Sequence, residues 1–238
     1  MNISSYSFCC CLNVFLCMDI CMCKDKNITF ALRLAKNIPM CMGSRTSFND
    51  YIKKYGMDGI AGQNPKVIWM TGLSGAGKTT LALALDEKIR EMGYFTIVFD
   101  GDVIRKGINK DLGYSDADRY ENIRRTAEIA KLFAGHGLIV ICSFISPLKT
   151  MRKLAKDIIG EQNFVEVFVD CPIEICEKRD VKGLYQKARH GLISEFTGIT
   201  SQYEAPENAD IEIQTSLLSI EKSVEMLTKN ILPLIAHS

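Results

Sequence analysis

Short runs of apolar residues alternate with longer amphipathic segments along the chain from about residue 66 onward. Short apolar runs bounded by turn-forming residues are typical of strands buried on both faces. Apolar positions that recur every three or four residues instead predict helices that bury one face. The predicted strands span residues 67–70, 95–99, 138–144, 164–170 and 209–215. The predicted helices span residues 81–93, 119–137 and 219–235, with a short helix that starts at residue 172.

This alternation of strands and helices predicts an α/β fold in which a mostly parallel sheet has helices on both faces. In sheets of this kind, ligands bind at the carboxyl ends of the strands. The motifs that carry chemistry in this chain all fall at such ends. We therefore expect them to form one shared site.

Residues 1–60 do not share this regular pattern. Seven of the ten cysteines lie in the first 41 residues, within an apolar stretch that follows neither helical nor strand periodicity. The segment KNITFALRLAKNIPM is basic and poor in acids, as in organelle transit peptides. Metal binding by Cys21 and Cys23 is an alternative, although no second matched pair of cysteines is present. We expect a disordered or targeting leader there and one folded domain over residues 61–238.

Composition and charge narrow the possible partners. The 238 residues carry a formal net charge of +1, so no overall field points to nucleic acid or to a membrane surface. No stretch approaches ~20 uninterrupted apolar residues, so no membrane-spanning helix is expected. We expect a cytoplasmic protein, or a mitochondrion-related or plastid one if the leader is a transit peptide. Cys142, Cys171 and Cys176 lie in or beside apolar runs and are expected to be buried thiols.

A glycine-rich turn follows the first predicted strand. Residues 72–79 read GLSGAGKT and match the phosphate-binding pattern G-x-x-x-x-G-K-[ST]. The glycines let successive backbone N–H groups point at phosphate oxygens, and the next helix adds the positive end of its dipole. Lys78 is expected to reach the outer phosphates, and the Thr79 hydroxyl to hold Mg²⁺. The predicted nucleotide contacts are Gly72, Leu73, Ser74, Gly75, Ala76, Gly77, Lys78, Thr79 and Thr80.

A nucleotide site alone leaves three classes open: a switch GTPase, a motor-type ATPase or a small-molecule kinase. The stretch Asn109-Lys110-Asp111 is similar to the guanine-reading signal N-K-x-D, but its aspartate comes one place early. A guanine reader is therefore not expected. Because the chain is also short for a motor ATPase, a small-molecule kinase is the favoured class.

Two carboxylates, Asp100 and Asp102, follow the second predicted strand. Charged residues at the carboxyl ends of parallel strands are rarely buried in the apolar core. Asp102 is a candidate to accept the proton of an attacking hydroxyl or to hold the metal ion. Its structural alternative is an N-cap for a helix that starts near Val103, and that role is compatible with function.

Basic and polar residues lie near the other predicted strand ends. Arg119 and Asn122 share one face of a long helix, and an arginine fork suits a phosphate or sulfate group. Arg105 is a third candidate. Ser146, which precedes a proline after the third strand, is expected to be extended and exposed. Residues 178–191 carry five Lys or Arg residues and are expected to form a mobile basic lid.

The string DGDVIRKGINKDLGYSDADRYENIRR, followed in order by EIAKLF, SFISP, FVDCPIEICEKRDVKGLYQKAR, EFTGI and QYEAPE, resembles the adenylylsulfate kinases. The resemblance covers roughly residues 65–235 and implies a P-loop kinase fold for the domain at residues 61–238. It also implies the reaction, in which ATP phosphorylates the 3′-hydroxyl of adenosine 5′-phosphosulfate (APS). The products would be ADP and 3′-phosphoadenylyl sulfate (PAPS), and Mg²⁺ would accompany ATP.

The same resemblance implies residue roles. Asp102 would be the base near the ribose 3′-hydroxyl and would lie with Thr79 near the metal. Lys182 matches a lid lysine, and Phe196 matches an aromatic residue that stacks on the APS adenine. The implied catalytic residues are Asp102, Lys78 and Ser146. The implied substrate contacts are Asp100, Asp102, Arg105, Tyr114, Arg119, Asn122, Ile145, Ser146, Lys182 and Phe196.

Ser146 stands where some descriptions of the family place a phosphorylated intermediate. An oriented 3′-hydroxyl beside Asp102 can attack the γ-phosphate directly, because P-loop catalysis is mostly positioning and charge stabilisation. We therefore expect direct transfer between the two substrates.

Several positions depart from the family pattern. Tyr114 stands where phenylalanine is common, and Thr200 replaces the aspartate that usually follows F-T-G-I. Leu148-Lys149 replaces Tyr-Arg, and Ser194-Glu195 replaces Lys-Gly. The last change removes a positive charge and adds a negative one beside an anionic substrate. We expect weakened APS affinity rather than loss of activity.

Partners follow from the same comparison. The chain has three widely spaced histidines and lacks the H-x-x-H signal of the sulfurylase to which many family members are fused. We expect the kinase alone, functionally linked to ATP sulfurylase, and the family implies a homodimer. One rival hypothesis is a kinase for a nucleoside monophosphate, shikimate or gluconate. Another is a non-catalytic nucleotide-binding protein, which only the altered Ser194-Glu195 favours.

Overall fold

The computed structural model describes residues 62–236, and the leader predicted at residues 1–60 lies outside this part of the chain. Five strands form one sheet in the order β2-β3-β1-β4-β5, and every neighbouring pair is parallel. The strands are β1 (Val67–Thr71), β2 (Thr96–Asp100), β3 (Ile139–Ser143), β4 (Phe164–Asp170) and β5 (Ile211–Gln214). The predicted α/β fold with a parallel sheet is confirmed.

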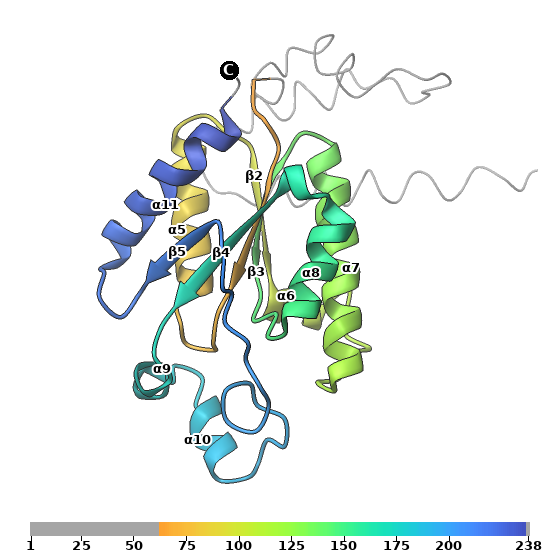
Figure 1. The fold of residues 1–238 in the computed structure, drawn as a ribbon, viewed down its shortest axis with the longest axis vertical. Helices are drawn as coiled ribbons and strands as arrows, with labels where there is room; N and C mark the ends of the chain where they lie inside the picture. Colours follow the sequence, from red (N-terminus) through yellow and green to blue (C-terminus); the bar gives the residue numbers. More distant parts are fainter. Residues whose placement is uncertain (1–61, 237–238) are drawn as a thin grey trace, which may run out of the picture. The chain divides into compact units, whose positions relative to one another are not determined.

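Helices cover both faces of the sheet (Figure 1). The helices α5 (Lys78–Glu91) and α11 (Ile220–Ile235) lie on one face. The helices α7 (Asp116–Gly135) and α8 (Lys149–Ile159) lie on the other. The short elements are α6 (Gly101–Lys106), η1 (Glu161–Asn163), α9 (Ile173–Arg179) and α10 (Leu184–Arg189). The last two lie beyond the carboxyl ends of the strands.

The sheet separates the apolar core into two layers, and the central strand β1 contributes side chains to both. Successive side chains of a strand point to opposite faces of its sheet. Ile68 and Met70 pack with the apolar residues of α5 and α11, whereas Val67 and Trp69 pack with those of α7 and α8. All four side chains are fully buried. This two-sided burial explains why the strand is a continuous apolar run rather than an alternating one.

The helix α7 begins earlier than the apolar pattern predicted, at Asp116 instead of residue 119. Ser115 caps it, because its Oγ accepts a hydrogen bond from the backbone N–H of Asp118 at 3.2 Å. Asp116 and Asp118 then place negative charge in the first turn, where it stabilises the helix dipole. The capping residues, not the apolar face, therefore set the start of this helix.

The sequence interpretation missed the helix α8 altogether. Its apolar residues Met151, Ala155 and Ile159 recur every four positions and are all buried. The sequence interpretation assigned no element between the predicted strands at residues 138–144 and 164–170. The helical signal was present in the sequence, and the omission matters because α8 carries a side chain that supports the site.

Other features of the described residues agree with expectation. Cys142, Cys171 and Cys176 are buried free thiols, and burial raises the pKa of Cys142 well above its usual range. Between residues 62 and 236, every helix is too short or too polar to span a bilayer.

Candidate active site

A cleft of about 620 Å³ opens at the carboxyl ends of the strands, between the phosphate loop, the start of α7 and the segment after α9. It brings together most residues predicted for the site. The predicted residues that line it are Ser74, Gly75, Gly77, Lys78, Thr79, Thr80, Asp100, Asp102, Arg105, Tyr114, Arg119, Asn122, Ile145, Ser146 and Lys182. Gly72, Leu73, Ala76 and Phe196 do not line it.

Glycine is required in the phosphate loop for two different reasons. A Cβ added at Gly72 would lie 2.5 Å from the carbonyl oxygen of Val169 on the neighbouring strand, so no side chain fits. Gly77 adopts a φ of 101° in the left-handed region and precedes the first residue of α5. The loop therefore passes close to β4 and then turns directly into the helix.

Lys78 is the first residue of α5, and it is only 8% exposed. Its Nζ donates hydrogen bonds to the carbonyl oxygens of Gly72 at 3.0 Å and Leu73 at 2.8 Å. Burial lowers the pKa of Lys78 from 10.5 to about 8, and the nearby Asp100 and Asp102 oppose this only weakly. The ammonium group is thus held within the loop, where a bound phosphate would favour its charged form.

ATP binding is expected to weaken as the pH rises through about 8, because neutral Lys78 cannot pair with phosphate. Phosphate raises the pKa of Lys78, so binding should take up protons in this range. Calorimetry in two buffers with different ionisation heats measures both quantities. Arginine does not titrate here, so Lys78→Arg should flatten the profile. Affinity and proton uptake that stay constant from about pH 7 to about pH 9 would contradict this assignment.

The two carboxylates after β2 have different tasks. Asp100 Oδ1 accepts from the backbone N–H of Asp102 at 2.9 Å and caps α6, while Asp100 Oδ2 accepts from the Thr79 hydroxyl at 2.7 Å. Asp102 instead forms an ion pair with Lys182. Both side chains of that pair are 58% exposed. The capping role considered for Asp102 therefore belongs to Asp100, and the Asp102 carboxylate faces the cleft.

Arg105 and Arg119 form one wall of the cleft. The guanidinium of Arg105 lies 4.6 Å from the centroid of the Tyr114 ring and donates to the Gly113 carbonyl at 2.6 Å. Arg119 is 8% exposed and donates to the carbonyl oxygens of Tyr114 and Glu195 and to the Thr197 hydroxyl, at 2.6–2.7 Å. Fixed guanidinium groups of this kind suit an anionic ligand.

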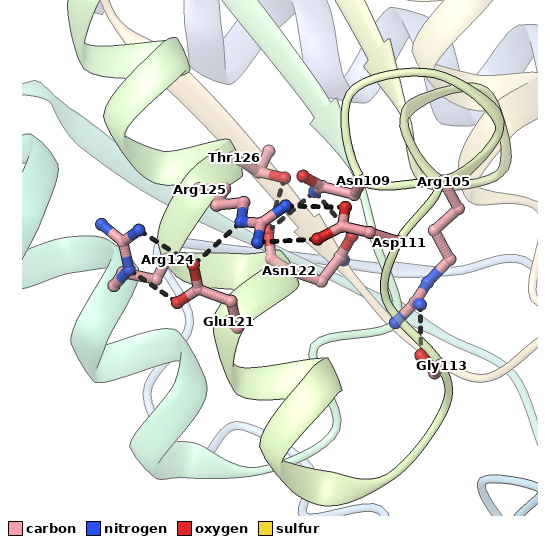
Figure 2. A network of polar contacts seen from close by, with 9 residues as sticks. All are labelled: Arg105, Asn109, Asp111, Gly113, Glu121, Asn122, Arg124, Arg125 and Thr126. Atoms are coloured by element: carbon pink, nitrogen blue, oxygen red, sulfur yellow. Dashed lines mark hydrogen bonds and ion pairs between the residues drawn. The ribbon is translucent and has the colours of Figure 1, made fainter.

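Asn122, the third predicted residue of this wall, is fixed by the stretch that resembles a guanine reader. The buried Asn109 Nδ2 donates to Asn122 Oδ1 at 2.9 Å (Figure 2). Asp111 pairs with Arg125, which also contacts Glu121. Arg124 and Arg125 lower the pKa of Glu121 to about 2. The loop that carries Asn109 and Asp111 is therefore fastened to α7 beside the cleft.

The segment after β3 differs from expectation. Ser146 was predicted to be exposed and extended, but it is 2% exposed and has a φ of 38°. The indole Nε1 of Trp69 donates to its Oγ at 3.1 Å, and the Thr71 hydroxyl donates to the Ile145 carbonyl at 2.7 Å. A polar side chain can be buried here because β1 supplies its partner. The exposure prediction for Ser146 was wrong.

Phe196 does not line the cleft. It is 8% exposed and packs edge-on against Tyr185, with ring centroids 4.8 Å apart. The backbone N–H of Phe196 donates to Thr200 Oγ1 at 2.8 Å. Thr200 therefore still closes this turn, although it replaces the aspartate of the family pattern.

The predicted lid contains the end of α9 and all of α10, and Asp180 joins these helices. Its carboxylate accepts from the backbone N–H groups of Tyr185 and Gln186 at 3.1 and 3.0 Å. Arg179, which was predicted only as one of the basic residues of the lid, donates to the carbonyl oxygens of Gly75 at 3.3 Å and Thr215 at 2.7 Å. This arginine ties the phosphate loop to the loop after β5. Its place in a basic stretch was visible, but its partners were not.

The chain is similar to known adenylylsulfate kinases in sequence and in fold. A family model described as adenylylsulphate kinase matches residues 64–214. An adenylyl-sulfate kinase of Bacteroides thetaiotaomicron is 52% identical over 174 residues, which cover 73% of this chain and 87% of the relative. One from Clostridium acetobutylicum is also 52% identical and covers 73% and 86%. The Mycobacterium tuberculosis APS kinase, solved with AMPPNP and APS, is 43% identical, with a TM-score of 0.69 over 71% of this chain and 98% of that one.

Proposed function

The chain belongs to the adenylylsulfate kinase family, and from that premise we propose how its cleft performs the reaction. The protein is an adenylyl-sulfate kinase, which transfers the γ-phosphate of ATP to the 3′-hydroxyl of APS and forms PAPS and ADP. One observation carries the assignment of roles. The carboxylate of Asp102 stands in the same cleft as the phosphate loop and the wall of Arg105 and Arg119.

We assign the triphosphate of ATP to the phosphate loop. Its backbone N–H groups and Lys78 would bind the β- and γ-phosphates. The Thr79 hydroxyl and the Asp100 carboxylate lie together beside the loop and are hard oxygen ligands of the kind that Mg²⁺ takes. Bound Mg²⁺ would neutralise charge on the phosphates. The metal role of Asp102 stays a prediction, since its carboxylate pairs with Lys182.

We assign the acceptor to the opposite wall. Arg105, Arg119 and Asn122 would hold the anionic phosphosulfate and the ribose, with Tyr114, Ile145 and Ser146 beside them. The assignment of Phe196 to the adenine stays a prediction, since its ring packs on Tyr185.

In the transfer step, the 3′-oxygen of APS forms a bond to the γ-phosphorus while the bond from that phosphorus to the β–γ bridging oxygen breaks. Asp102 accepts the hydroxyl proton, and ADP leaves with the bridging oxygen. Lys78 and Lys182 stabilise the charge that shifts onto the leaving phosphate. The Ser146 hydroxyl is buried and bonded to Trp69, which supports direct transfer rather than a phosphoserine intermediate.

Restoring the family pair at the exposed positions 194 and 195 should strengthen APS binding. The variant Ser194→Lys/Glu195→Gly keeps the carbonyl that Arg119 binds, adds one positive charge and removes one negative charge near the anion. We expect the KM for APS to fall about threefold to tenfold, with a smaller gain at high salt. Steady-state kinetics measures this effect. The control Glu161→Gly/Gln162→Lys makes the same charge change in η1 before β4. Equal effects in both variants would show that positions 194 and 195 have no special role in APS binding.

Three further assignments are proposals. We propose that the domain spans residues 61–238, that the enzyme is a homodimer as the family resemblance implies, and that ATP sulfurylase supplies its APS. The bacterial origin of the compared relatives agrees with the cytoplasmic localisation predicted from the sequence, which stays a prediction.

ADP release tests the proposed function. The full chain is assayed with ATP and Mg²⁺, and APS is compared with AMP, gluconate and shikimate as acceptors. We expect ADP formation that saturates with APS alone. Saturation with another of these acceptors would show that the chain is a kinase for that acceptor and not for APS.

A further inference from the structure

One buried arginine that does not line the cleft contacts the backbone of residues 146 and 147, which line the cleft beside Arg119 and Asn122, on the side that we assign to the acceptor (the acceptor wall). Arg152 of α8 is 4% exposed and does not line the cleft. Its Nη1 donates to the carbonyl oxygens of Ser146 at 2.9 Å and Pro147 at 3.2 Å. Its Nη2 donates to the carbonyl oxygen of Glu204 at 2.7 Å. A single planar guanidinium thus joins two segments that are distant in sequence.

The charge of this arginine is balanced by Glu166 on β4. Arg152 Nε lies 2.8 Å from Glu166 Oε1, and the two side chains are only 5% and 19% exposed. Burial raises the pKa of Glu166, and Arg152 opposes that shift. A buried pair is weak evidence for stability, because the cost of removing both charges from water is large. The four contacts of Arg152 are therefore better explained by the backbone that its guanidinium holds in place.

What it holds is a strained turn. Ser146 has a φ of 38°, a left-handed value that is unfavourable for a residue with a side chain and persists only where surrounding contacts fix it. The contacts come from three directions: Arg152 at the Ser146 carbonyl, Trp69 at its hydroxyl, and Thr71 at the Ile145 carbonyl. The Tyr203 hydroxyl lies 3.2 Å from Thr71 Oγ1 and links the second segment to the same point.

We propose that Arg152, charge-balanced by Glu166, is a positioning residue that sets the acceptor wall of the cleft by fixing the backbone of residues 145–147. This inference rests on the proposed assignment of that wall to APS. We assign ATP to the phosphate loop and α5, and none of the hydrogen bonds of Arg152 reaches either of them. Loss of the arginine should therefore impair acceptor binding selectively.

The expected signature is a change in one substrate's kinetics only. In Arg152→Met, which keeps an apolar stem of similar length, the KM for APS should rise about tenfold or more, because a misplaced wall loses binding contacts. The KM for ATP should stay within about twofold. In Arg152→Lys, a point charge can pair with Glu166 but cannot form the same fork, so the KM for APS should lie between those of the wild type and Arg152→Met.

The experiment uses the full-length wild type, Arg152→Met, Arg152→Lys and Glu166→Gln. The melting temperature of each protein is measured first. The KM values for APS and ATP are then measured at one temperature well below the lowest of these melting temperatures. Lys153→Met is the matched control, because Lys153 lies next on α8 with a 73% exposed side chain and pairs only at the surface with Asp157. If Arg152→Met fails to fold, Arg152→Lys and Glu166→Gln decide. Both should raise the KM for APS above that of the control.

The result that overturns the inference is a lowered melting temperature with an unchanged KM for APS, or equal increases in the KM for APS and for ATP. Either would show that Arg152 supports the fold alone. A wild type that does not turn over APS would instead overturn the proposed function, so the two failures are distinguishable.

Discussion

Replacing Asp102 with alanine is expected to lower APS-dependent kcat by about 10²–10⁴-fold while ATP binding changes little. The carboxylate faces the cleft and caps no helix, since Asp100 caps α6. Its removal therefore takes away the proton acceptor without unfolding the local structure. It also leaves Lys182 without its carboxylate partner, which should, if anything, favour anionic phosphate. Steady-state ADP release and calorimetric ATP titration measure the two quantities.

The matched comparison uses two further variants. Asp102→Asn keeps the shape of the side chain but not its basicity, so it should be nearly as inactive as the alanine variant. Asp157→Asn removes a surface carboxylate that pairs only with Lys153 on the same helix, and it should retain full activity. Undiminished turnover in Asp102→Asn would exclude Asp102 as the base.

Replacing Lys78 with methionine is expected to lower kcat by about 10²–10³-fold, because the charge that develops on the transferred phosphate loses its buried counterion. ATP affinity should fall as well.

The stability of the Lys78→Met protein, in contrast, should rise. Because burial lowers the pKa of Lys78 from 10.5 to about 8, the charged lysine that predominates below pH 8 destabilises the folded state relative to the unfolded one. Removing the charge should raise the free energy of unfolding at neutral pH by the order of 1 kcal/mol, after the two lost carbonyl hydrogen bonds are offset.

This combination of a more stable and a less active protein separates a functional lysine from a structural one. Lys88→Met is the control, since Lys88 lies on the same helix with a half-exposed side chain and pairs only with Glu91. It should leave kcat, ATP affinity and the melting temperature nearly unchanged. If Lys78→Met lowered the melting temperature and kept its activity, the lysine would be holding the loop rather than the phosphate.

Local signals in the sequence predicted the parallel sheet and the phosphate loop. The apolar run at Val67–Met70 predicted β1 because this strand is buried on both faces, and the loop glycines predicted a backbone that has no room for side chains. Features set by contacts distant in sequence were not predictable in this way. Arg119 meets a carbonyl 76 residues away, and Arg152 meets one 52 residues away.

The wrong prediction for Ser146 has the same cause. Ser146 was expected to be exposed from its place before a proline, but the partner that makes its burial possible is Trp69 on another strand. The adenine-stacking role of Phe196 stays a prediction, and in the structure its ring packs against Tyr185. The helix α8 is a different case, because its apolar periodicity was present and was overlooked. Because α8 was not predicted, Arg152 received no role from the sequence.

The central claim is direct transfer of the γ-phosphate from ATP to the 3′-hydroxyl of APS. The most direct measurement mixes the full-length enzyme with APS and ATP labelled in the γ-phosphate, quenches the reaction within one turnover, and separates nucleotides from protein. The label should appear in PAPS, in equal amount to the ADP formed, and it should not appear on the protein. Label that appears on the protein before it appears in PAPS would contradict direct transfer. Transfer of the label that does not require APS would contradict the function itself.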